Sequence, residues 1–386
     1  MRKWYLLSCA LVLGAWLAAC MSPLPPPRTA TQPPGESMVT TWAGSGRTGP
    51  LGGGYADGPA LEAKFHEPAG LIVDAGSNVY VSDWRNHRLR AISLDGLVTT
   101  VAGSGASEPK GGYLDGPATQ ARLFGPEGLA VDRQGNLFVA DSRNNCIRRI
   151  SFDGTVTTVA GSGQPGLLED LVDGPGDQAR FGQPSDVAVS GDGDLYVTDF
   201  LHHCIRKITP DGMVSILAGN GLPGGEDGVG QASSFELPNR IAIDRQGNLY
   251  VTEGRARDFG ERLGGNRVRK ITPDGTVTTM AGTGQPGYRD GAAAETQFDI
   301  PTGVAVDQAG NVYVADTGNH RIRKIGTDGM VTTLDGSGIP GYADGAAAQA
   351  QFWYPMDVAV GPGGALYVAD WKNHRVRKIT LPGSLR

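Results

Sequence analysis

Residues 298–335 read FDIPTGVAVDQAGNVYVADTGNHRIRKIGTDGMVTTLD, and this stretch decides the fold. It opens with Phe298 and Pro301 and then holds four short apolar runs, separated by a Gly-Asn turn, an Asn-His hairpin and an Asp-Gly turn. Runs of this length, rich in β-branched residues and bounded by Gly, Asn and Asp, are typical of antiparallel strands joined by hairpins. The stretch therefore predicts a unit of four antiparallel strands.

The same pattern recurs along the chain, and its units begin 54 to 63 residues apart. A phenylalanine opens each unit, and a proline follows it by three residues, or by two in the second unit. The openings are Phe65, Phe124, Phe181, Phe235, Phe298 and Phe352, followed by Pro68, Pro126, Pro184, Pro238, Pro301 and Pro355. Four-stranded units repeated around an axis form a propeller. The sequence predicts an all-β, six-bladed β-propeller of four-stranded antiparallel blades.

The two ends of the repeat array indicate how the ring closes. The sixth unit runs from Phe352 to Thr380 and lacks a fourth strand, whereas residues 39–46 read VTTWAGSG and match VTTVAGSG at residues 98–105. An N-terminal strand that completes the last blade would remove two exposed sheet edges. We therefore expect residues 39–386 to form one propeller closed by its first strand.

The residues before the propeller have the features of an export signal. Arg2 and Lys3 precede an apolar run, and residues 17–20 read LAAC, which resembles the lipobox of bacterial lipoproteins. This resemblance implies cleavage before Cys20 and lipidation of that cysteine. The alternatives are an ordinary secretory signal or a short membrane span, although the apolar run is short for a span of roughly 20 residues. The prediction is a signal peptide at 1–20.

A proline-rich linker is expected to follow at residues 21–38, because its composition suits an extended stalk rather than a core. Met21 stands where aspartate is the usual inner-membrane retention signal, so we expect attachment to the outer membrane of the bacterial envelope. The formal net charge of the chain is −6, which argues against a nucleic-acid partner.

Three hairpins resemble the signature of the NHL repeat family. They read DWRNHRLR at residues 83–90, DTGNHRIR at 316–323 and DWKNHRVR at 370–377, with a looser match in the second and third units. The linker between units, with its recurring Asp-Gly, alanine and phenylalanine, is similar to NHL arrays of secreted bacterial proteins and teneurin-type receptors. This resemblance implies a propeller that mainly binds partners, with a minority of enzymatic relatives.

Residues that occur at the same place in every unit are interpreted as structural. The hairpin histidines His87, His203, His320 and His374 are expected to form hydrogen bonds rather than a metal cluster. The Asp-Gly pairs are interpreted as turns, and the third-strand arginines as a solvated network facing carboxylates of neighbouring blades. Cys146 and Cys204 lie at equivalent places in different blades, too far apart for a disulfide. We expect no cofactor and no metal.

The candidate ligand site lies where the repeat is broken. The long Asp-Gly loops and the Asn-His hairpins share one face, which is the natural binding face. Where the first strands enter the central channel, three units replace glycine by Asp186, Arg240 and Asp357, and Glu127 lies beside this ring. The fourth unit also carries an insertion at 254–264, which contains Arg255 and Arg257. These six residues are the predicted ligand-binding set.

The predicted function is that of an envelope-anchored scaffold or receptor which binds a protein, peptide or glycan on its loop-rich face. The alternative is a propeller lyase or lactone hydrolase with a metal at the channel mouth, for which Glu127, Asp186 and Asp357 are the candidate ligands. A purely structural role is a third possibility.

Overall fold

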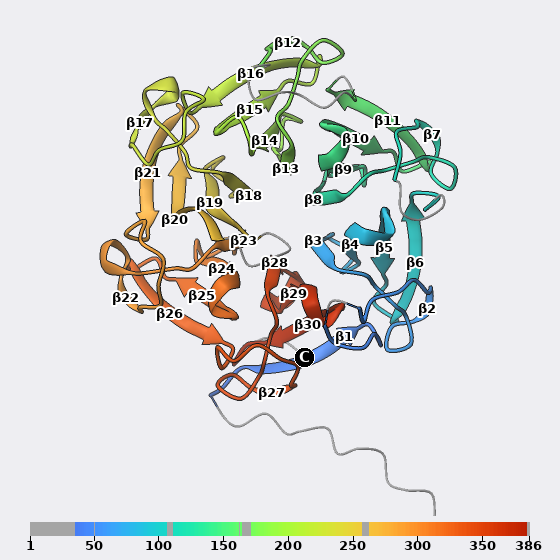
Figure 1. Cartoon of the computed structure of the whole chain (residues 1–386), viewed down its shortest axis with the longest axis vertical. Coiled ribbons are helices and arrows are strands. Elements are labelled where there is room, and N and C mark those ends of the chain that lie inside the picture. Colours follow the sequence, from blue (N-terminus) through green and yellow to red (C-terminus); the bar gives the residue numbers. More distant parts are fainter. Residues whose placement is uncertain are drawn as a thin grey trace, which may run out of the picture. The chain divides into compact units, whose positions relative to one another are not determined.

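The computed structural model describes residues 35–49, 51–105, 111–161, 163, 171–256 and 262–383, with the side chains of residues 255, 256, 262 and 263 left out. These residues form a ring of six antiparallel sheets around a central channel, as Figure 1 shows. The predicted six-bladed propeller is therefore confirmed. The signal peptide, most of the linker, Cys20 and Arg257 lie outside the described residues.

Each blade has five strands instead of the predicted four. The first four strands follow the apolar runs, and the fifth is a two-residue strand from the linker that pairs with the fourth strand at the outer edge. In blade 1, for example, Gly58 pairs with Val98 and Pro59 with Leu97. A Gly-Pro pair carries no strand pattern, because proline lacks the backbone donor and glycine disfavours strands. The sequence therefore gave no signal for this strand.

From the channel outward, the blades contain the following strands. Blade 1 has β3 (Pro68–Val73), β4 (Val79–Asp83), β5 (Arg88–Ile92), β6 (Leu97–Ala102) and β2 (Gly58–Pro59). Blade 2 has β8 (Pro126–Val131), β9 (Leu137–Asp141), β10 (Cys146–Ile150), β11 (Thr155–Ala160) and β7 (Gly116–Pro117). Blade 3 has β13 (Pro184–Val189), β14 (Leu195–Asp199), β15 (Cys204–Ile208), β16 (Met213–Ala218) and β12 (Gly174–Pro175).

The other half of the ring repeats this order. Blade 4 has β18 (Pro238–Ile243), β19 (Leu249–Ala256), β20 (Arg262–Ile271), β21 (Thr276–Ala281) and β17 (Gly228–Val229). Blade 5 has β23 (Pro301–Val306), β24 (Val312–Asp316), β25 (Arg321–Ile325), β26 (Met330–Asp335) and β22 (Gly291–Ala292). Blade 6 has β28 (Pro355–Val360), β29 (Leu366–Asp370), β30 (Arg375–Thr380), β1 (Met38–Ala43) and β27 (Gly345–Ala346).

Short 3-10 helices occur in the connections. They are η1 (Trp84–Asn86), η2 (Ser142–Asn144), η3 (Gly230–Ala232), η4 (Ala293–Glu295), η5 (Thr317–Asn319), η6 (Pro362–Gly364) and η7 (Trp371–Asn373). Within the described part of the chain, no helix is long and apolar enough to cross a membrane.

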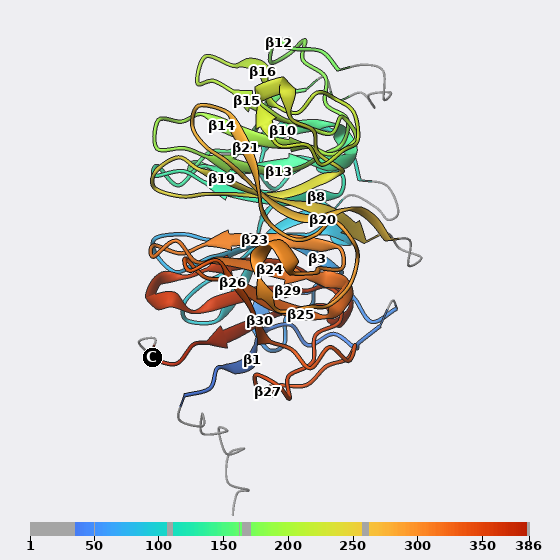
Figure 2. The same ribbon diagram turned by 90° about the vertical axis from the view of Figure 1, so that its left-hand side faces the viewer.

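The ring closes through β1, as predicted. Residues from Met38 to Ala43 pair antiparallel with β30 of blade 6, with Val39 opposite Ile379. The other edge of β1 pairs with β27, so the strand is enclosed on both sides. Figure 2 shows β1 lying next to β30 and β27. The first and last parts of the propeller are thus held in one sheet.

The core lies between the blades and is built around one large buried side chain from each linker. Phe65, Phe181, Phe235, Phe298 and Phe352 are buried there. In blade 2 this place belongs to Leu123, which is 1% exposed, and not to the predicted Phe124. The Phe124 amide instead donates to Asp141, as the His66 amide donates to Asp83. The misassigned phenylalanine also explains why its proline follows after only two residues.

The third-strand arginines form buried ion pairs within their own blades, so the prediction of a solvated network between blades was wrong. Arg90 is fully buried and contacts Asp83 of β4 at 2.8 Å and Asp57 of the linker at 2.5 Å. Asp57 also accepts a hydrogen bond from the Thr100 amide of β6. The Asp-Gly aspartates therefore join the linker to the blade rather than only shaping a turn. The same Arg–carboxylate contacts recur for Arg148, Arg206, Arg269, Arg323 and Arg377.

Both cysteines of the described chain are free thiols, as predicted, and both are buried. Cys146 and Cys204 begin the third strands of blades 2 and 3, and neither forms a disulfide. Burial raises the pKa of each thiol well above its ordinary value. The thiolate form that drives thiol chemistry is therefore suppressed in the folded protein.

Candidate functional site

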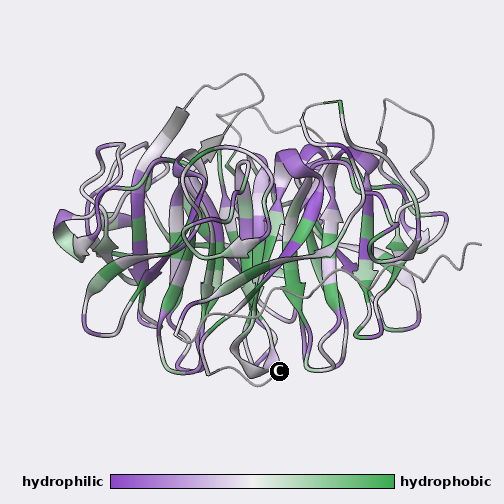
Figure 3. Ribbon diagram, turned by 90° about the horizontal axis from the view of Figure 1, so that it is seen from below, coloured by the Kyte–Doolittle hydropathy of each residue, from purple (hydrophilic) through white to green (hydrophobic). Residues whose placement is uncertain are grey.

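The two faces of the ring differ in their connections. We call the face with the long linkers and the 3-10 hairpins the loop face, and the opposite face the short-turn face. Figure 3 shows this edge-on, with the short hairpins and the C-terminal end at the bottom. Exposure increases along the first strands toward the short-turn face: in β3 the first four residues are buried and the last two are partly exposed. The other five first strands show the same trend. The channel is therefore closed near the loop face and open at the short-turn face.

The hairpin histidines form structural hydrogen bonds, as predicted, and the structure shows that these bonds join neighbouring blades. His87 adopts φ 53° and its Nδ1 accepts a hydrogen bond from the Gly125 amide of the next blade at 3.1 Å. His203, His320 and His374 accept equivalent bonds. In blades 2 and 4 the side-chain oxygens of Asn145 and Asn266 do the same. The shared requirement is a residue that tolerates positive φ and presents an acceptor, which asparagine and histidine both meet.

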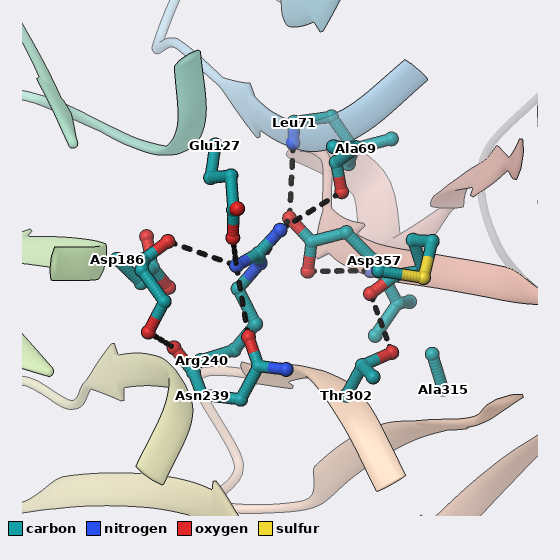
Figure 4. Close-up of polar contacts among 12 residues, drawn as sticks. Ala69, Leu71, Glu127, Asp186, Asn239, Arg240, Thr302, Ala315 and Asp357 are labelled. Atoms are coloured by element: carbon teal, nitrogen blue, oxygen red, sulfur yellow. Dashed lines mark hydrogen bonds and ion pairs between the residues drawn. The ribbon is translucent and has the colours of Figure 1, made fainter. Parts of the chain in front are cut away.

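Arg240 spans the channel from the first strand of blade 4, as Figure 4 shows. Its side chain is 1% exposed. Nη1 donates to the Ser185 carbonyl of blade 3 at 2.8 Å, and Nη2 donates to the Ala69 carbonyl of blade 1 at 3.2 Å. Nη1 also lies 3.5 Å from Glu127 Oε2 of blade 2, and Nε lies 3.9 Å from Asp357 Oδ2 of blade 6. One guanidinium therefore contacts four other blades and fills the channel at this level.

Asp186 and Asp357 connect their blades to the next ones through backbone amides. Asp186 Oδ2 accepts from the Ile241 amide at 2.9 Å, and Asp357 Oδ2 accepts from the Leu71 amide at 2.9 Å. Each first strand is the inner edge of its sheet, so its channel-side amides need a partner from outside the sheet. The two carboxylates supply that partner in blades 4 and 1.

Where glycine occupies this position, the neighbouring blade leaves no room for a side chain. A Cβ on Gly128 would lie 1.7 Å from Asp186 Oδ1, and a Cβ on Gly303 would lie 2.5 Å from the Asp357 Cα. Glycine before an aspartate-bearing blade is therefore a packing requirement. The residue at this position in one blade therefore depends on the residue at the same position in the next blade around the ring.

Burial dominates the electrostatics of this cluster. Desolvation raises the pKa of Asp186 to about 8, with Arg240 opposing the shift and the charge of Asp357 adding to it. Desolvation also raises the pKa of Asp357 to about 6, although Arg240 lowers it. Three buried carboxyl groups, those of Glu127, Asp186 and Asp357, face one guanidinium. At neutral pH the cluster therefore retains a proton on its carboxyl groups.

The structure brings together four of the six predicted site residues. Asp186, Arg240, Asp357 and Glu127 meet inside the channel, each at most 6% exposed, rather than on the loop face. The backbone of Arg255 continues the extended hairpin of β19 and β20, where it pairs with Leu263. Its side chain and the whole of Arg257 lie outside the described residues.

A second group of charged residues, absent from the predicted set, lies on the loop face where blades 6 and 1 meet. Glu67 is 2% exposed and contacts Arg85 and Lys372, each at 2.7 Å. Burial alone would raise the pKa of Glu67, but hydrogen bonds from Lys372 and Arg85 outweigh it and hold the pKa below its ordinary value. Lys372 Nζ also lies over the Trp371 ring at 3.6 Å.

The aromatic part of this group continues into blade 2. Arg85 and Arg143 lie over the Trp84 ring, with distances of 4.7 and 4.6 Å from each guanidinium carbon to the ring centre. The sequence signal for the group was available: tryptophan follows the hairpin aspartate only in blades 1 and 6, and only Glu67 places an acid directly before the linker proline. We call Glu67, Trp84, Arg85, Arg143, Trp371 and Lys372 the loop-face cluster.

Within the described residues, no group of three or more His, Cys, Asp or Glu side chains is placed to hold a metal ion. The metal hypothesis relied on Glu127, Asp186 and Asp357. In the structure Glu127 and Asp357 lie near Arg240, and Asp186 and Asp357 accept hydrogen bonds from backbone amides.

Comparison with known proteins places the chain among repeat propellers. The NHL repeat model matches residues 125–150, 181–208, 298–325 and 352–379, in blades 2, 3, 5 and 6. Protein SUPPRESSOR OF QUENCHING 1 of Arabidopsis thaliana is 30% identical over 326 residues, which cover 81% of this chain and 30% of that protein. Teneurin-3 of Mus musculus is 30% identical over 285 residues, covering 64% of this chain and 10% of that protein. The chain thus spans a third or less of these relatives.

Among solved structures, an auxiliary nutrient binding protein from Bacteroides thetaiotaomicron superposes with a TM-score of 0.65 at 17% identity. The match covers 90% of this chain and 76% of that one. At this identity the likeness concerns the fold. Four matched repeats within a ring of six blades show that the chain belongs to the NHL-repeat β-propeller family.

Proposed function

We propose that this chain is an exported, envelope-anchored receptor or scaffold whose loop face binds a protein, peptide or glycan. The observation that carries this proposal is that the blades differ from one another mainly on the loop face. Their scaffold residues are repeated, whereas the side chains around the loop-face end of the channel change from blade to blade. Loop positions carried on a rigid scaffold are the usual place for binding residues.

The residue before each linker proline illustrates the difference. All six have the same left-handed backbone, with φ between 52° and 64°. Their side chains nevertheless range from acidic to aromatic: Glu67, Gly125, Gln183, Leu237, Ile300 and Tyr354. A backbone this strained favours glycine or asparagine. Most blades carry a different side chain, so the fold alone does not explain the choice.

The loop-face cluster supplies the chemistry for a ligand. It presents the exposed Arg143 and the partly exposed Arg85 over the buried Trp84 ring. Glu67, Trp371 and Lys372 are buried beside them, and arginine is enriched in binding interfaces. The formal charge of the cluster is +2, on a chain whose formal net charge is −6. This local excess favours a ligand with acidic groups, such as an acidic peptide segment or an acidic glycan.

The proposed anchor is compatible with a free loop face. Met38 at the start of β1 pairs with Thr380 at the end of β30, on the short-turn side of blade 6. A tether from a lipidated Cys20 would join the propeller there and leave the loop face open. In a bacterial host, Cys20→Ala should release the protein from the outer-membrane fraction. An unmodified N-terminus in the parental protein, found by mass spectrometry, would contradict the anchor.

Two arginines of blade 2 offer a matched test of the binding face. Arg143 is exposed in the loop-face hairpin and Arg133 is exposed in the short turn of the same blade. Arrays of acidic peptides and acidic glycans should bind the parental protein and Arg133→Ala equally, and Arg143→Ala at least tenfold more weakly. Melting temperatures control for folding. Equal loss in both variants, or none in Arg143→Ala, would place the ligand elsewhere.

A further inference from the structure

The central channel contains a cavity that the proposed loop-face ligand does not use. Its volume is about 190 Å³, and it lies between the level of Asp186 and Asp357 and the short-turn face. Branched aliphatic side chains from all six first strands line it, including Val131, Val189 and Ile243. These three residues are partly exposed, so the cavity is reached from the short-turn face.

The inner end of the cavity carries negative charge. Asp186 of blade 3 and Asp357 of blade 6 belong to its lining, at 6% and 5% exposure. Behind them, Arg240 of blade 4 and Glu127 of blade 2 are the other charged groups of this level, while blades 1 and 5 contribute Ala69-Gly70 and Thr302-Gly303. The group therefore has three carboxyls for one guanidinium. Buried charge of one sign is costly unless a proton or a bound cation compensates it.

The wall of the cavity adds acceptors to this charge. Each first strand is the innermost strand of its sheet and has no strand partner on the channel side. At the level of Ala69 and Ser185 the carbonyls of these strands accept hydrogen bonds from Arg240, whereas channel-side carbonyls nearer the short-turn face are available to a ligand that donates hydrogen bonds. An ammonium group has three donors and no acceptor, which suits carboxylates and carbonyls together.

We propose that this cavity binds a small organic ammonium ion, with its charged end at Asp186 and Asp357 and its aliphatic chain along the valine and isoleucine walls. At about 30 Å³ per water-sized group, the volume holds roughly six non-hydrogen atoms. Pentylammonium has this size. The site faces away from the loop-face cluster, so it stands or fails independently of the proposed function.

Binding is linked to protonation in a defined direction. Burial raises the pKa of Asp186 to about 8 and that of Asp357 to about 6, so a proton occupies the pair at pH 7. An ammonium ion competes with that proton, whereas an amine remains charged to about pH 10. The affinity for pentylammonium should therefore rise between pH 6 and pH 8.5, with protons released on binding.

Calorimetric titration of the purified propeller with pentylammonium chloride tests the proposal. Titrations at pH 7 in two buffers with different ionisation enthalpies should reveal proton release. Asp186→Asn and Asp357→Asn should each weaken binding at least tenfold. Asp192→Asn is the matched control, because Asp192 is an exposed acid of the same blade near the cavity opening. This variant should bind as the parental protein does.

Neutral and inorganic probes decide the ligand class. Pentan-1-ol and pentanoate should bind at least tenfold more weakly than pentylammonium, and K⁺ at the same concentration should not displace it. No binding of pentylammonium at any pH would overturn the proposal. So would equal binding of pentan-1-ol, unchanged affinity in both asparagine variants, or displacement by K⁺. Thermal melting of each variant separates loss of binding from loss of the fold.

Discussion

Replacing Asp335 by alanine is expected to stabilise the propeller, most strongly at alkaline pH. Asp335 ends the fourth strand of blade 5, where the other blades have Ala43, Ala102, Ala160, Ala218 and Ala281. Its side chain is 1% exposed, and its Oδ1 accepts a hydrogen bond from Ser37 Oγ at 2.8 Å. Oδ2 has no hydrogen-bond partner among the described residues. The fold therefore carries a buried carboxyl group that five blades do without.

The magnitude follows from the ionisation equilibrium. Burial raises the pKa of Asp335 from 3.8 to about 7, although the Ser37 bond lowers it. A folded pKa above the unfolded value means that stability is present below pH 3.8 and is lost progressively as the pH rises to 7. At about 1.4 kcal/mol per pH unit, the loss amounts to about 4 kcal/mol at pH 8 and about 1.6 kcal/mol at pH 5.

Alanine removes this cost together with the Ser37 hydrogen bond, which contributes about 1 kcal/mol. The expected gain in free energy of unfolding is thus about 3 kcal/mol at pH 8 and about 0.5 kcal/mol at pH 5. Urea unfolding at both pH values, followed by circular dichroism, measures the difference. Ala102→Asp is the reverse control and should destabilise blade 1 mainly at pH 8. A gain that does not depend on pH, or a loss at pH 8, would refute the reasoning.

Three further predictions concern the scaffold. His87→Ala should lower the free energy of unfolding by about 1–2 kcal/mol, because the inter-blade hydrogen bond is lost. His87→Asn should retain most of the parental stability, because Asn145 accepts the equivalent bond in blade 2. Equal loss of stability in both variants would contradict this role. Deleting residues 39–46 should strongly lower the melting temperature, because it exposes two edges of the closing sheet; an unchanged melting temperature would argue against closure by β1. Cys146 and Cys204 should react with a thiol reagent only in denaturant, each with one equivalent; rapid labelling of the native protein would contradict their burial.

Much of the fold was predictable because each blade repeats the same local solution. The strand runs, the hairpins and the closing strand each leave a pattern in the sequence, and all are present in the structure. The fifth strand of each blade was missed because Gly58-Pro59 reads as a turn. The repeat pattern identified Phe124 as the opening residue of the second unit, whereas the equivalent place in the structure is filled by Leu123. Residue type alone did not decide between two adjacent apolar residues.

The sequence predicted that the charged residues gather at the channel, but it predicted neither their position below the loop face nor their burial. Equivalent places in the first strands meet at the channel, so a break of the glycine pattern there predicts that Asp186, Arg240 and Asp357 gather. Their burial and their bonds to Ala69, Ser185, Leu71 and Ile241 depend on channel width and on the unpaired strand edges. Neither the channel width nor the unpaired strand edges can be read from the sequence. Both give the charged residues a structural role, which is to form hydrogen bonds with the backbone of neighbouring blades.

A break in the repeat is therefore not sufficient evidence of a binding residue in this fold. Arg240 and Asp335 both depart from their equivalents, yet each is at most 1% exposed, and both contact groups of other blades. Arg85 departs less from its equivalents, but its side chain is 37% exposed on the loop face. A residue that binds a ligand must both differ from its equivalents in the other blades and be exposed. In the loop-face cluster Arg143 is exposed and Arg85 is partly exposed, so these two arginines carry the proposed receptor function, while Glu67, Trp84, Trp371 and Lys372 are buried beside them. The buried charges of the channel matter for ligands only where the cavity reaches Asp186 and Asp357.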